Sequence, residues 1–390
     1  MKTEADTNAA TPVPLLDVAR SNVPIRDEVL AAIAEVYDSG RFLFGPTVGQ
    51  LESDVAKISN AKFGVGCASG SDALLLSLMA LGICPGDEVI CPSFSFFATA
   101  SCISRLGAKI VFADIDPLTY NIDPEDIRRK ITPKTRAIIP VHLFGQSAAM
   151  DNICCIAAEN EIPVVEDAAQ AIGAAYHGRP VGSWGQVGCI SFYPTKNLGG
   201  FGDGGMLTTN SDIIADRLRL LAGHGMRPRY YHSEVGINSR LDSFQAAALV
   251  VKIQHLDEYT AQRRTNACRY FELFEAAGLT DSGIELPYTD PAAHHVWNQF
   301  SLRVSNGRRD ELRAHLQANN IGSEIYYPVP LHMQACYRDL GYRTGDLPHT
   351  EAAAESILHL PIFPELTAEE QQSVIQCLAA FCRKDARMAA

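Results

Sequence analysis

The residue with the most distinctive chemical setting in this sequence is Lys196. It follows an apolar run at 187–190 that predicts a short buried strand, and a glycine-rich turn at 199–205 comes soon after it. Lysine is seldom buried unless it is paired or reactive. A partly desolvated amine loses its proton more easily and can form a Schiff base with an aldehyde. For this position considered alone, an ordinary surface lysine on a loop is the alternative.

Two further segments place polar side chains just after predicted strands. Asp167 follows a strand at 162–165, and Ser71 lies in a small-residue turn, 68–72, between a strand and a helix. A carboxylate at a strand end can reach a ligand, and a helix N-terminus offers free N–H groups to a phosphate. Both residue types are also ordinary helix N-caps, so each motif alone leaves two interpretations open. Glu166 should point away from Asp167, because side chains alternate along a strand.

An aromatic-rich segment at 92–99 and a polar segment at 238–247 complete the candidate set. Phe96 lies in the first segment, after a predicted strand that ends at Cys91. An aromatic ring at a strand end could stack on a planar cofactor, although aromatic residues more often belong to the core. The second segment leads into a long predicted helix, and its spacing alone decides nothing.

The pattern from residue 63 to about residue 210 alternates short apolar runs with helical stretches. Strands are expected at 63–67, 88–91, 109–112, 137–141, 162–166, 188–192 and 205–209, and helices at 72–81 and 98–106. This rhythm is typical of an α/β fold with a mostly parallel sheet, whose ligands bind at the carboxyl ends of the strands.

Helical periodicity flanks this region on both sides. Helices are expected at 26–39, ending at Gly40, at 48–58 and over one long stretch from about 242 to 277. The C-terminal region predicts strands at 298–304 and 322–327 and helices at 309–319 and 369–381. We therefore expect a disordered tail at 1–12, a large domain at 13–255 and a smaller α+β domain at 256–390.

The composition argues against several classes of protein. The formal net charge of −12 disfavours a nucleic-acid or anionic-membrane surface, since both need clustered Lys and Arg. No apolar run approaches the roughly 18 residues that span a bilayer, and the N-terminal residues lack the apolar core of a signal peptide. The eleven cysteines show no metal-ligand spacing, and their odd number predicts reduced thiols in the cytoplasm.

Eight motifs in this sequence resemble those of the DegT/StrS family of sugar aminotransferases, which are pyridoxal-phosphate enzymes of fold type I. They lie at 70–74, 92–99, 121–124, 141–145, 166–171, 191–200, 238–247 and 327–332. The likeness extends from about residue 13 to residue 380. One such motif would be weak evidence, whereas eight in the family's order are highly specific. The resemblance implies a large domain with a mostly parallel sheet between helices, and a smaller C-terminal domain.

The resemblance also implies a role for each matched position. Lys196 would form the Schiff base with pyridoxal 5′-phosphate, and Asp167 would hold the pyridinium nitrogen. The other cofactor contacts would be Gln170 near the ring hydroxyl, Phe96 on the ring face, Gly70, Ser71 and Ser191 at the phosphate, and Asn238 from the neighbouring subunit of a homodimer. The substrate contacts would be Tyr326, Tyr327, His332, Arg229 and Tyr231.

The expected reaction transfers an amino group, from glutamate by resemblance, to the keto-sugar of a nucleotide-linked sugar. Pyridoxamine phosphate would be the intermediate form of the cofactor, and the freed Lys196 amine would be the general base. The product would be an amino sugar for a surface polysaccharide or a secondary metabolite. Two alternatives stay open, an aminotransferase of a cyclic ketone such as a keto-inositol and a non-catalytic regulatory homologue. The sequence specifies neither the sugar carbon nor the nucleotide.

Overall fold

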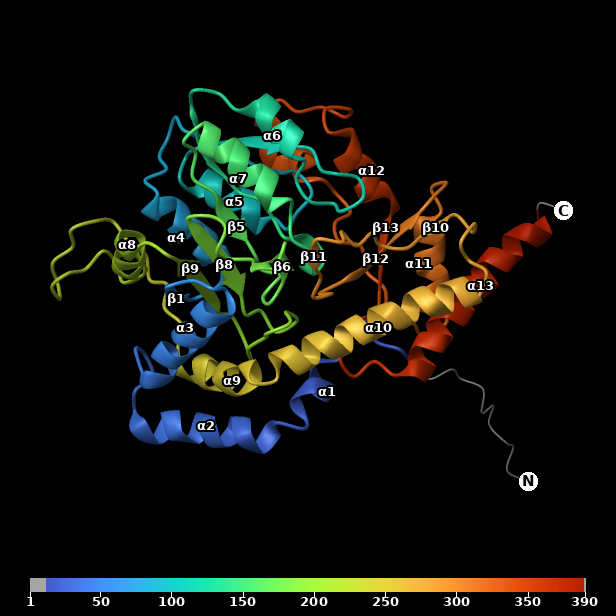
Figure 1. The fold of residues 1–390 in the computed structure, drawn as a ribbon, viewed down its shortest axis with the longest axis horizontal. Coiled ribbons are helices and arrows are strands. Elements are labelled where there is room, and N and C mark those ends of the chain that lie inside the picture. The colour runs from blue at the N-terminus through green and yellow to red at the C-terminus, as the bar shows by residue number, and fades with distance from the viewer. Residues whose placement is uncertain (1–11, 389–390) are drawn as a thin grey trace.

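The computed structural model describes residues 12–388, with side chains as far as residue 383. The predicted disordered tail lies outside the described residues except for Pro12. Figure 1 shows a larger and a smaller lobe, and the helix α10 (Leu256–Ala276) runs from one to the other. No helix within the described part of the chain is long and apolar enough to span a membrane. The predicted domain boundary at 255/256 stays a prediction.

Seven strands form the sheet of the larger lobe. They are β1 (Phe63–Cys67), β2 (Glu88–Pro92), β3 (Lys109–Ala113), β4 (Thr135–Ile138), β5 (Val165–Asp167), β8 (Val187–Ser191) and β9 (Gly205–Thr209). The orders β3-β2-β4 and β5-β8-β9-β1 are joined by parallel bridges, Ile138 to Val164 and Val141 to Asp167. Strand β9 runs against its two neighbours, while the other pairings are parallel. The prediction of a mostly parallel sheet is confirmed.

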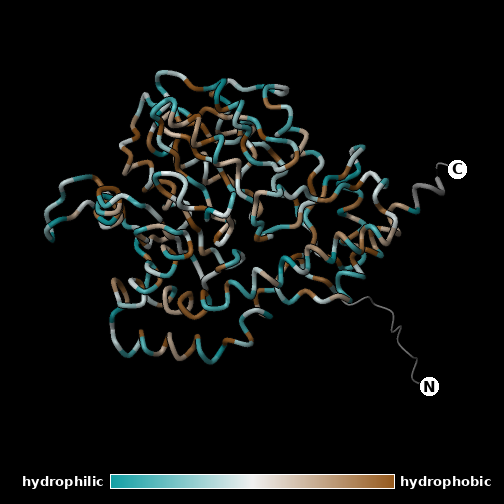
Figure 2. The backbone as a smooth tube through the Cα atoms, in the orientation of Figure 1, coloured by the Kyte–Doolittle hydropathy of each residue, from teal (hydrophilic) through white to brown (hydrophobic). Residues whose placement is uncertain are grey.

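Helices cover both faces of this sheet, because successive side chains along each strand point to opposite sides. In β8, Cys189 packs toward α4 (Gly70–Ala80) and Ile190 packs toward α3 (Pro46–Ile58). The remaining helices of this lobe are α5 (Ala98–Arg105), α6 (Pro124–Lys130), α7 (Met150–Glu159), α8 (Asp212–Ala222) and α9 (Ser243–Ile253). Hydrophobic segments accordingly gather inside the lobe, and hydrophilic segments lie on its outer helices and loops (Figure 2).

Of the two N-terminal helices, α2 (Arg26–Ser39) lies along the outside of the larger lobe (Figure 1). Helix α1 (Val18–Asn22) instead contacts α13 (Ala368–Met388), where Arg20 Nη2 lies 2.7 Å from Glu370 Oε1. Val29 of α2 packs against Ala248 of α9. Helix α2 ends at Gly40, which adopts φ 64°, so the predicted glycine cap is confirmed.

The smaller lobe packs helices against a three-stranded antiparallel sheet. Its strands are β10 (Ile284–Glu285), β12 (Phe300–Val304) and β13 (Ile357–Leu360), and its helices besides α10 are α11 (Arg309–Ala318), α12 (Pro348–Ser356) and α13 (Ala368–Met388). A second small sheet contains β6 (Ala175–Tyr176), β7 (Arg179–Pro180) and β11 (Ala293–His294). Short 3-10 turns cover Leu143–Gly145, Leu331–Met333 and Ala335–Leu340.

Two predicted elements of the C-terminal half are wrong. The long helix at 242–277 is two helices, α9 and α10, because the chain turns between Gln254 and His255 from the larger lobe toward the smaller one. The strand at 322–327 is absent, and only Glu324 there makes a single bridge, to His359. After Glu324 the chain leaves the sheet, and Tyr326 and Tyr327 line a cavity. The last helix starts where it was expected but continues to Met388.

Candidate active site

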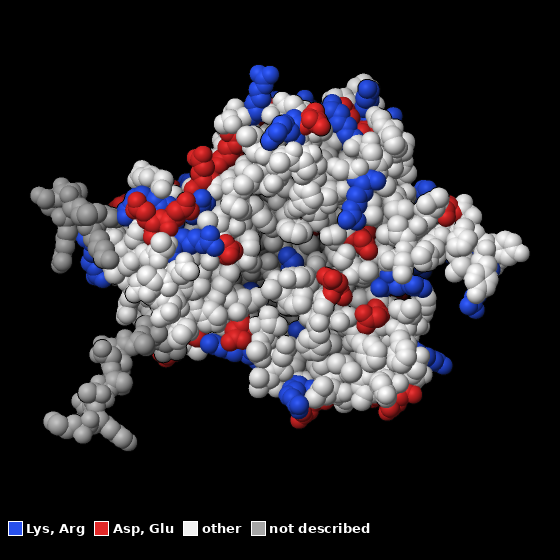
Figure 3. Space-filling view, turned by 180° about the vertical axis from the view of Figure 1, so that it is seen from behind, with Lys and Arg blue, Asp and Glu red and all other residues white. Residues whose placement is uncertain are grey.

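A cavity of about 710 Å³ lies where the carboxyl ends of β5 and β8 meet the N-terminus of α4. Nine of the predicted site residues line it: Gly70, Ser71, Phe96, Asp167, Gln170, Ser191, Lys196, Tyr326 and Tyr327. Figure 3 shows the face opposite to that of Figure 1, which is hollowed near its centre and carries interspersed positive and negative side chains.

Lys196 reaches this cavity from the turn after β8. The turn is closed by a hydrogen bond from the Lys196 N–H to the Tyr193 carbonyl oxygen, at 2.9 Å. Burial lowers the pKa of the Lys196 amine to about 8, and the negative charge of Asp167 opposes this shift. A lysine with a pKa near 8 carries a substantial fraction of neutral, nucleophilic amine near neutral pH.

Asp167 is the last residue of β5, and its carboxylate is buried at the cavity wall. The Thr99 hydroxyl donates to Asp167 Oδ2 at 2.8 Å, and the Ala169 N–H donates to Oδ1 at 3.2 Å. Burial raises the pKa of Asp167, while Thr99, Ala169 and the charge of Lys196 act in the opposite direction. The carboxylate is therefore held in one orientation by donors that favour its ionised form.

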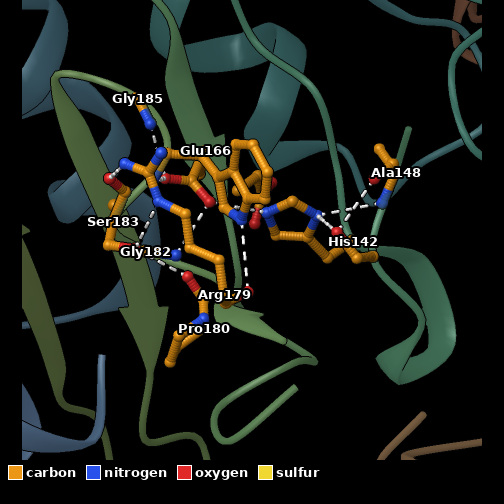
Figure 4. A network of polar contacts seen from close by, with 12 residues as sticks. His142, Ala148, Glu166, Arg179, Pro180, Gly182, Ser183 and Gly185 are labelled. Atoms are coloured by element: carbon orange, nitrogen blue, oxygen red, sulfur yellow. Dashed lines mark hydrogen bonds and ion pairs between the residues drawn. The ribbon is translucent and has the colours of Figure 1, made fainter. Parts of the chain in front are cut away.

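Glu166 points to the opposite side of β5, as strand alternation predicted, and it organises the loop that follows β7. Its Oε2 atom accepts from the Gly182 N–H at 2.7 Å (Figure 4). Its Oε1 atom accepts from the N–H groups of Trp184 and Gly185 at 2.7 and 2.8 Å. A fully buried carboxylate with these three donors is a structural anchor rather than a ligand contact.

His142 completes this buried network on the other side of Glu166 (Figure 4). The Ala148 N–H donates to His142 Nδ1 at 3.1 Å, so the proton of the neutral ring lies on Nε2. Nε2 then donates to Glu166 Oε2 at 3.1 Å. Because the Asp167 carbonyl oxygen accepts from the His142 N–H at 3.0 Å, the same residue also fixes the end of β5. This network was not predicted from the sequence.

The N-terminus of α4 provides a setting for an anion. The Ser69 side chain caps the helix by accepting from the Asp72 N–H at 3.1 Å. The other N–H groups of the first turn have no carbonyl partner within the helix, as at any helix start. A Cβ atom on Gly70 would lie 2.7 Å from Ser191 Cβ, so only glycine lets the helix start this close to the end of β8. The positive end of the helix dipole and the Ser71 and Ser191 hydroxyls thus border the cavity.

Aromatic and amide side chains form another part of the cavity wall. Phe96 is 58% exposed, and its ring centroid lies 6.3 Å from that of Tyr327. Gln170 is oriented by the Phe144 N–H, which donates to Gln170 Oε1 at 2.7 Å. An exposed phenylalanine at the cavity wall is available to stack on a planar ligand.

Four predicted residues do not line this cavity. His332 is fully buried, with Nδ1 2.7 Å from Ser93 Oγ and Nε2 3.3 Å from Glu351 Oε1. Arg229 and Tyr231 lie on the loop that projects beside α8 in Figure 1, and Asn238 follows that loop. The side chains of these three residues are exposed, and none of them lines the cavity.

Several cavity residues escaped the sequence analysis. Tyr193, Thr195 and Asp203 flank Lys196 in the chain, and Gln299 comes from the smaller lobe. Thr99 lay within the aromatic-rich motif but was not recognised as the donor to Asp167. No group of three metal-ligating side chains gathers among the side chains that the structure describes, residues 12–383.

Comparisons with known proteins agree with this geometry. The sequence pattern of the DegT/DnrJ/EryC1/StrS aminotransferase family matches residues 24–379. The chain is 48% identical to a "Pleiotropic regulatory protein" of Geobacillus stearothermophilus over 95% of this chain and 99% of the relative. It is 43% identical to a UDP-N-acetyl-3-dehydro-alpha-D-glucosamine 3-aminotransferase of Acidithiobacillus ferrooxidans, over 92% and 95% of the two chains.

The structure is also similar to a solved one. The crystal structure of DesV from S. venezuelae in complex with a ketimine intermediate superposes with a TM-score of 0.91 at 42% sequence identity. The superposition covers 96% of this chain and 99% of that one. A likeness this extensive includes both lobes and the cavity between them.

Proposed function

Because this chain belongs to the DegT/DnrJ/EryC1/StrS aminotransferase family, we propose that it transfers an amino group to the keto-sugar of a nucleotide-linked sugar. It is a pyridoxal-phosphate-dependent aminotransferase of fold type I. The observation that carries the proposal is the convergence, in one cavity, of an amine of lowered pKa, a buried carboxylate and a helix N-terminus.

The side chains of the cavity fit this cofactor. Asp167 offers a buried acceptor for the pyridinium N–H, and the exposed ring of Phe96 can cover the face of the cofactor ring. The phosphate fits the start of α4, with Ser71 and Ser191, where glycine leaves space for it. Gln170 lines the wall close to these groups. When bound, the cofactor supplies the reactive carbonyl and the electron-withdrawing ring that this chemistry requires.

The protein's own contribution is to hold and move protons. Lys196 is the residue that we propose takes the proton from the substrate carbon and returns it, because a pKa of about 8 lets its amine both accept and release a proton near neutral pH. Asp167, held by Thr99, accepts the pyridinium hydrogen bond and keeps that proton in place. Lys196 therefore handles the proton that is transferred, and Asp167 handles the proton that stays on the ring nitrogen.

The sugar and the amino donor are the finer part of the proposal. The names of three relatives refer to UDP- or dTDP-linked sugars with an amino or oxo group at carbon 3. These names support amination at the same carbon here. Tyr326 and Tyr327 line the cavity on the side of the smaller lobe and are proposed to contact the sugar. We propose glutamate as the donor, as in the resemblance described above.

We further propose a homodimer in which Arg229, Tyr231 and Asn238 of one copy complete the cavity of the other. All three side chains are exposed and none lines the cavity of its own chain, which supports this arrangement. We infer that the enzyme works in the cytoplasm, since all eleven cysteines are free thiols.

The proposal is tested with the purified protein. It should be yellow and lose its long-wavelength absorbance band when glutamate is added. A panel of UDP- and dTDP-linked 3-keto-sugars and keto-inositols, analysed by mass spectrometry, then identifies the acceptor. Turnover of keto-inositols alone would favour the first alternative. A colourless protein without turnover would favour a regulatory homologue, a possibility that the name of one relative keeps open. Lys196→Ala should be inactive, whereas Lys134→Ala, at an exposed control position, should be active.

A further inference from the structure

A second, much smaller cavity of about 30 Å³ lies behind the Lys196 turn. Thr195 and Lys196 line both this cavity and the active-site cavity, so the turn separates the two. Its other walls come from α1, the junction of α9 and α10, and the loop that precedes α13 (Figure 1). The proposed function assigns nothing to this second cavity.

Two buried cations line the second cavity. Lys252, near the end of α9, is 5% exposed, and Arg263 of α10 is 4% exposed. Arg263 Nη1 donates to the carbonyl oxygens of Trp297 and Ile362 at 3.1 and 2.9 Å, but its Nε atom is buried without a hydrogen-bond partner. Lys252 Nζ lies 5.5 Å from the centre of the Phe201 ring. Neither cation forms a salt bridge within the described residues.

The local charge balance is positive. Among the residues that the structure describes, Glu365 is the one carboxylate whose charge acts on both Lys252 and Arg263. Its Oε2 atom is already occupied by the Ser21 hydroxyl, at 2.9 Å. Burial lowers the pKa of Lys252 to about 8 and that of Arg263 to about 10, which reports the cost of desolvating the two charges. Buried charges of this kind require a counter-charge, and a neutral water molecule would satisfy an N–H group but leave the charge unbalanced.

We propose that this cavity binds one chloride ion, held by Lys252 and Arg263. The unpartnered Nε–H of Arg263 and the N–H groups of Lys252 are the donors that a halide needs. A volume of about 30 Å³ exceeds the roughly 10–15 Å³ that one water requires, so a single monatomic ion fits. The positive charges of Lys252 and Arg263 favour an anion in this cavity and repel metal ions. The negative charge of the bound ion would offset the positive charges of Lys252 and Arg263 behind the Lys196 turn.

The direct test is a crystal structure of the holoenzyme grown with bromide in place of chloride. We expect an anomalous peak at the bromine edge within hydrogen-bonding distance of Lys252 Nζ and Arg263 Nε. Density that refines as water, without an anomalous peak, would overturn the proposal. No substrate is needed, so the result does not depend on which sugar the enzyme uses.

A solution test avoids any influence of crystal conditions. Chloride in exchange with the wild-type holoenzyme should show a broadened ³⁵Cl resonance that narrows when excess bromide competes for the site. Lys252→Met keeps the length of the side chain and removes its charge, so we expect the excess linewidth to fall at least two-fold. Lys252→Arg should retain it, as should the matched control Lys134→Met at an exposed position. Equal broadening in Lys252→Met and the wild type would contradict the proposal, and circular dichroism would establish that each variant is folded.

Discussion

The Lys196 amine and the Asp167 carboxylate line one cavity. The charge of each residue opposes the shift that burial causes in the pKa of the other. Burial lowers the pKa of Lys196, and the charge of Asp167 raises it. Burial raises the pKa of Asp167, and the charge of Lys196 lowers it. Each residue therefore helps to set the protonation state of its partner, which gives their chemistry a specific dependence on pH.

The first prediction concerns the reactivity of Lys196 in protein freed of its cofactor. With a pKa of about 8, the neutral amine fraction rises roughly five-fold between pH 7 and pH 8 and then levels off. The rate of pyridoxal phosphate capture, followed by absorbance, should rise with the same midpoint. Asp167→Asn removes the charge that raises this pKa, so its midpoint should move below 8. The exposed control Asp38→Asn should leave it unchanged, and an upward shift in Asp167→Asn would refute the relationship.

The second prediction concerns the Thr99 hydroxyl. Thr99→Val keeps the shape of the side chain but removes the donor to Asp167, whose pKa the hydrogen bond lowers. A hydrogen bond to a charged group contributes about 1.5–3 kcal/mol, so kcat should fall roughly 10- to 100-fold. The acidic limb of the pH–rate profile should move to higher pH. Ser101→Ala on the same helix is the control, and an unshifted acidic limb in Thr99→Val would count against the assignment.

The third prediction concerns the approach of α4 to β8. In Gly70→Ala the new methyl group would lie 2.7 Å from Ser191 Cβ, and relieving that clash should cost about 1–3 kcal/mol. We expect weaker binding of pyridoxal phosphate and a lower Tm, measured with and without cofactor. Gly49 lies within α3, and a Cβ atom added there would meet no atom within 4 Å outside the backbone of its own helix. Gly49→Ala should therefore be neutral or stabilising by about 0.5–1 kcal/mol. Similar effects at both positions would show that the close approach is unimportant.

The fourth prediction concerns the buried anchor, Glu166. In Glu166→Gln an NH₂ group replaces an oxygen that accepts backbone N–H bonds, so at least one buried donor loses its partner. Chemical denaturation should show a loss of about 2–4 kcal/mol in the free energy of unfolding. Glu35→Gln, on the exposed side of α2, should stay within about 0.5 kcal/mol of the wild type. A stable Glu166→Gln protein would mean that the network contributes little.

The parallel strands could be predicted because they are largely buried and therefore read as short continuous apolar runs, such as residues 89–91 and 110–112. The break between α9 and α10 could not be predicted. Helical periodicity continues through Gln254 and His255 without a glycine or proline, and the turn depends on how the two lobes pack.

The candidate site shows the same division. Asp167 ends β5, and Ser71 and Lys196 follow soon after β1 and β8, where the topology of a parallel sheet concentrates ligand contacts. Gln299 has no such signal, since it meets the cavity only because the smaller lobe folds against the larger one. The Thr99–Asp167 hydrogen bond depends on where α5 begins relative to β5, which spacing along the chain does not determine.

The neighbouring carboxylates of β5 restrict how this protein can evolve. Asp167 serves the cavity and Glu166 holds the loop behind it, because the two side chains point to opposite faces of one strand. Deleting or inserting a single residue before Glu166 within β5 would exchange the two faces, placing the catalytic carboxylate in the core and the anchor in the cavity. Length changes should therefore be absent from this strand across related sequences, even though point substitutions and loop insertions accumulate around it.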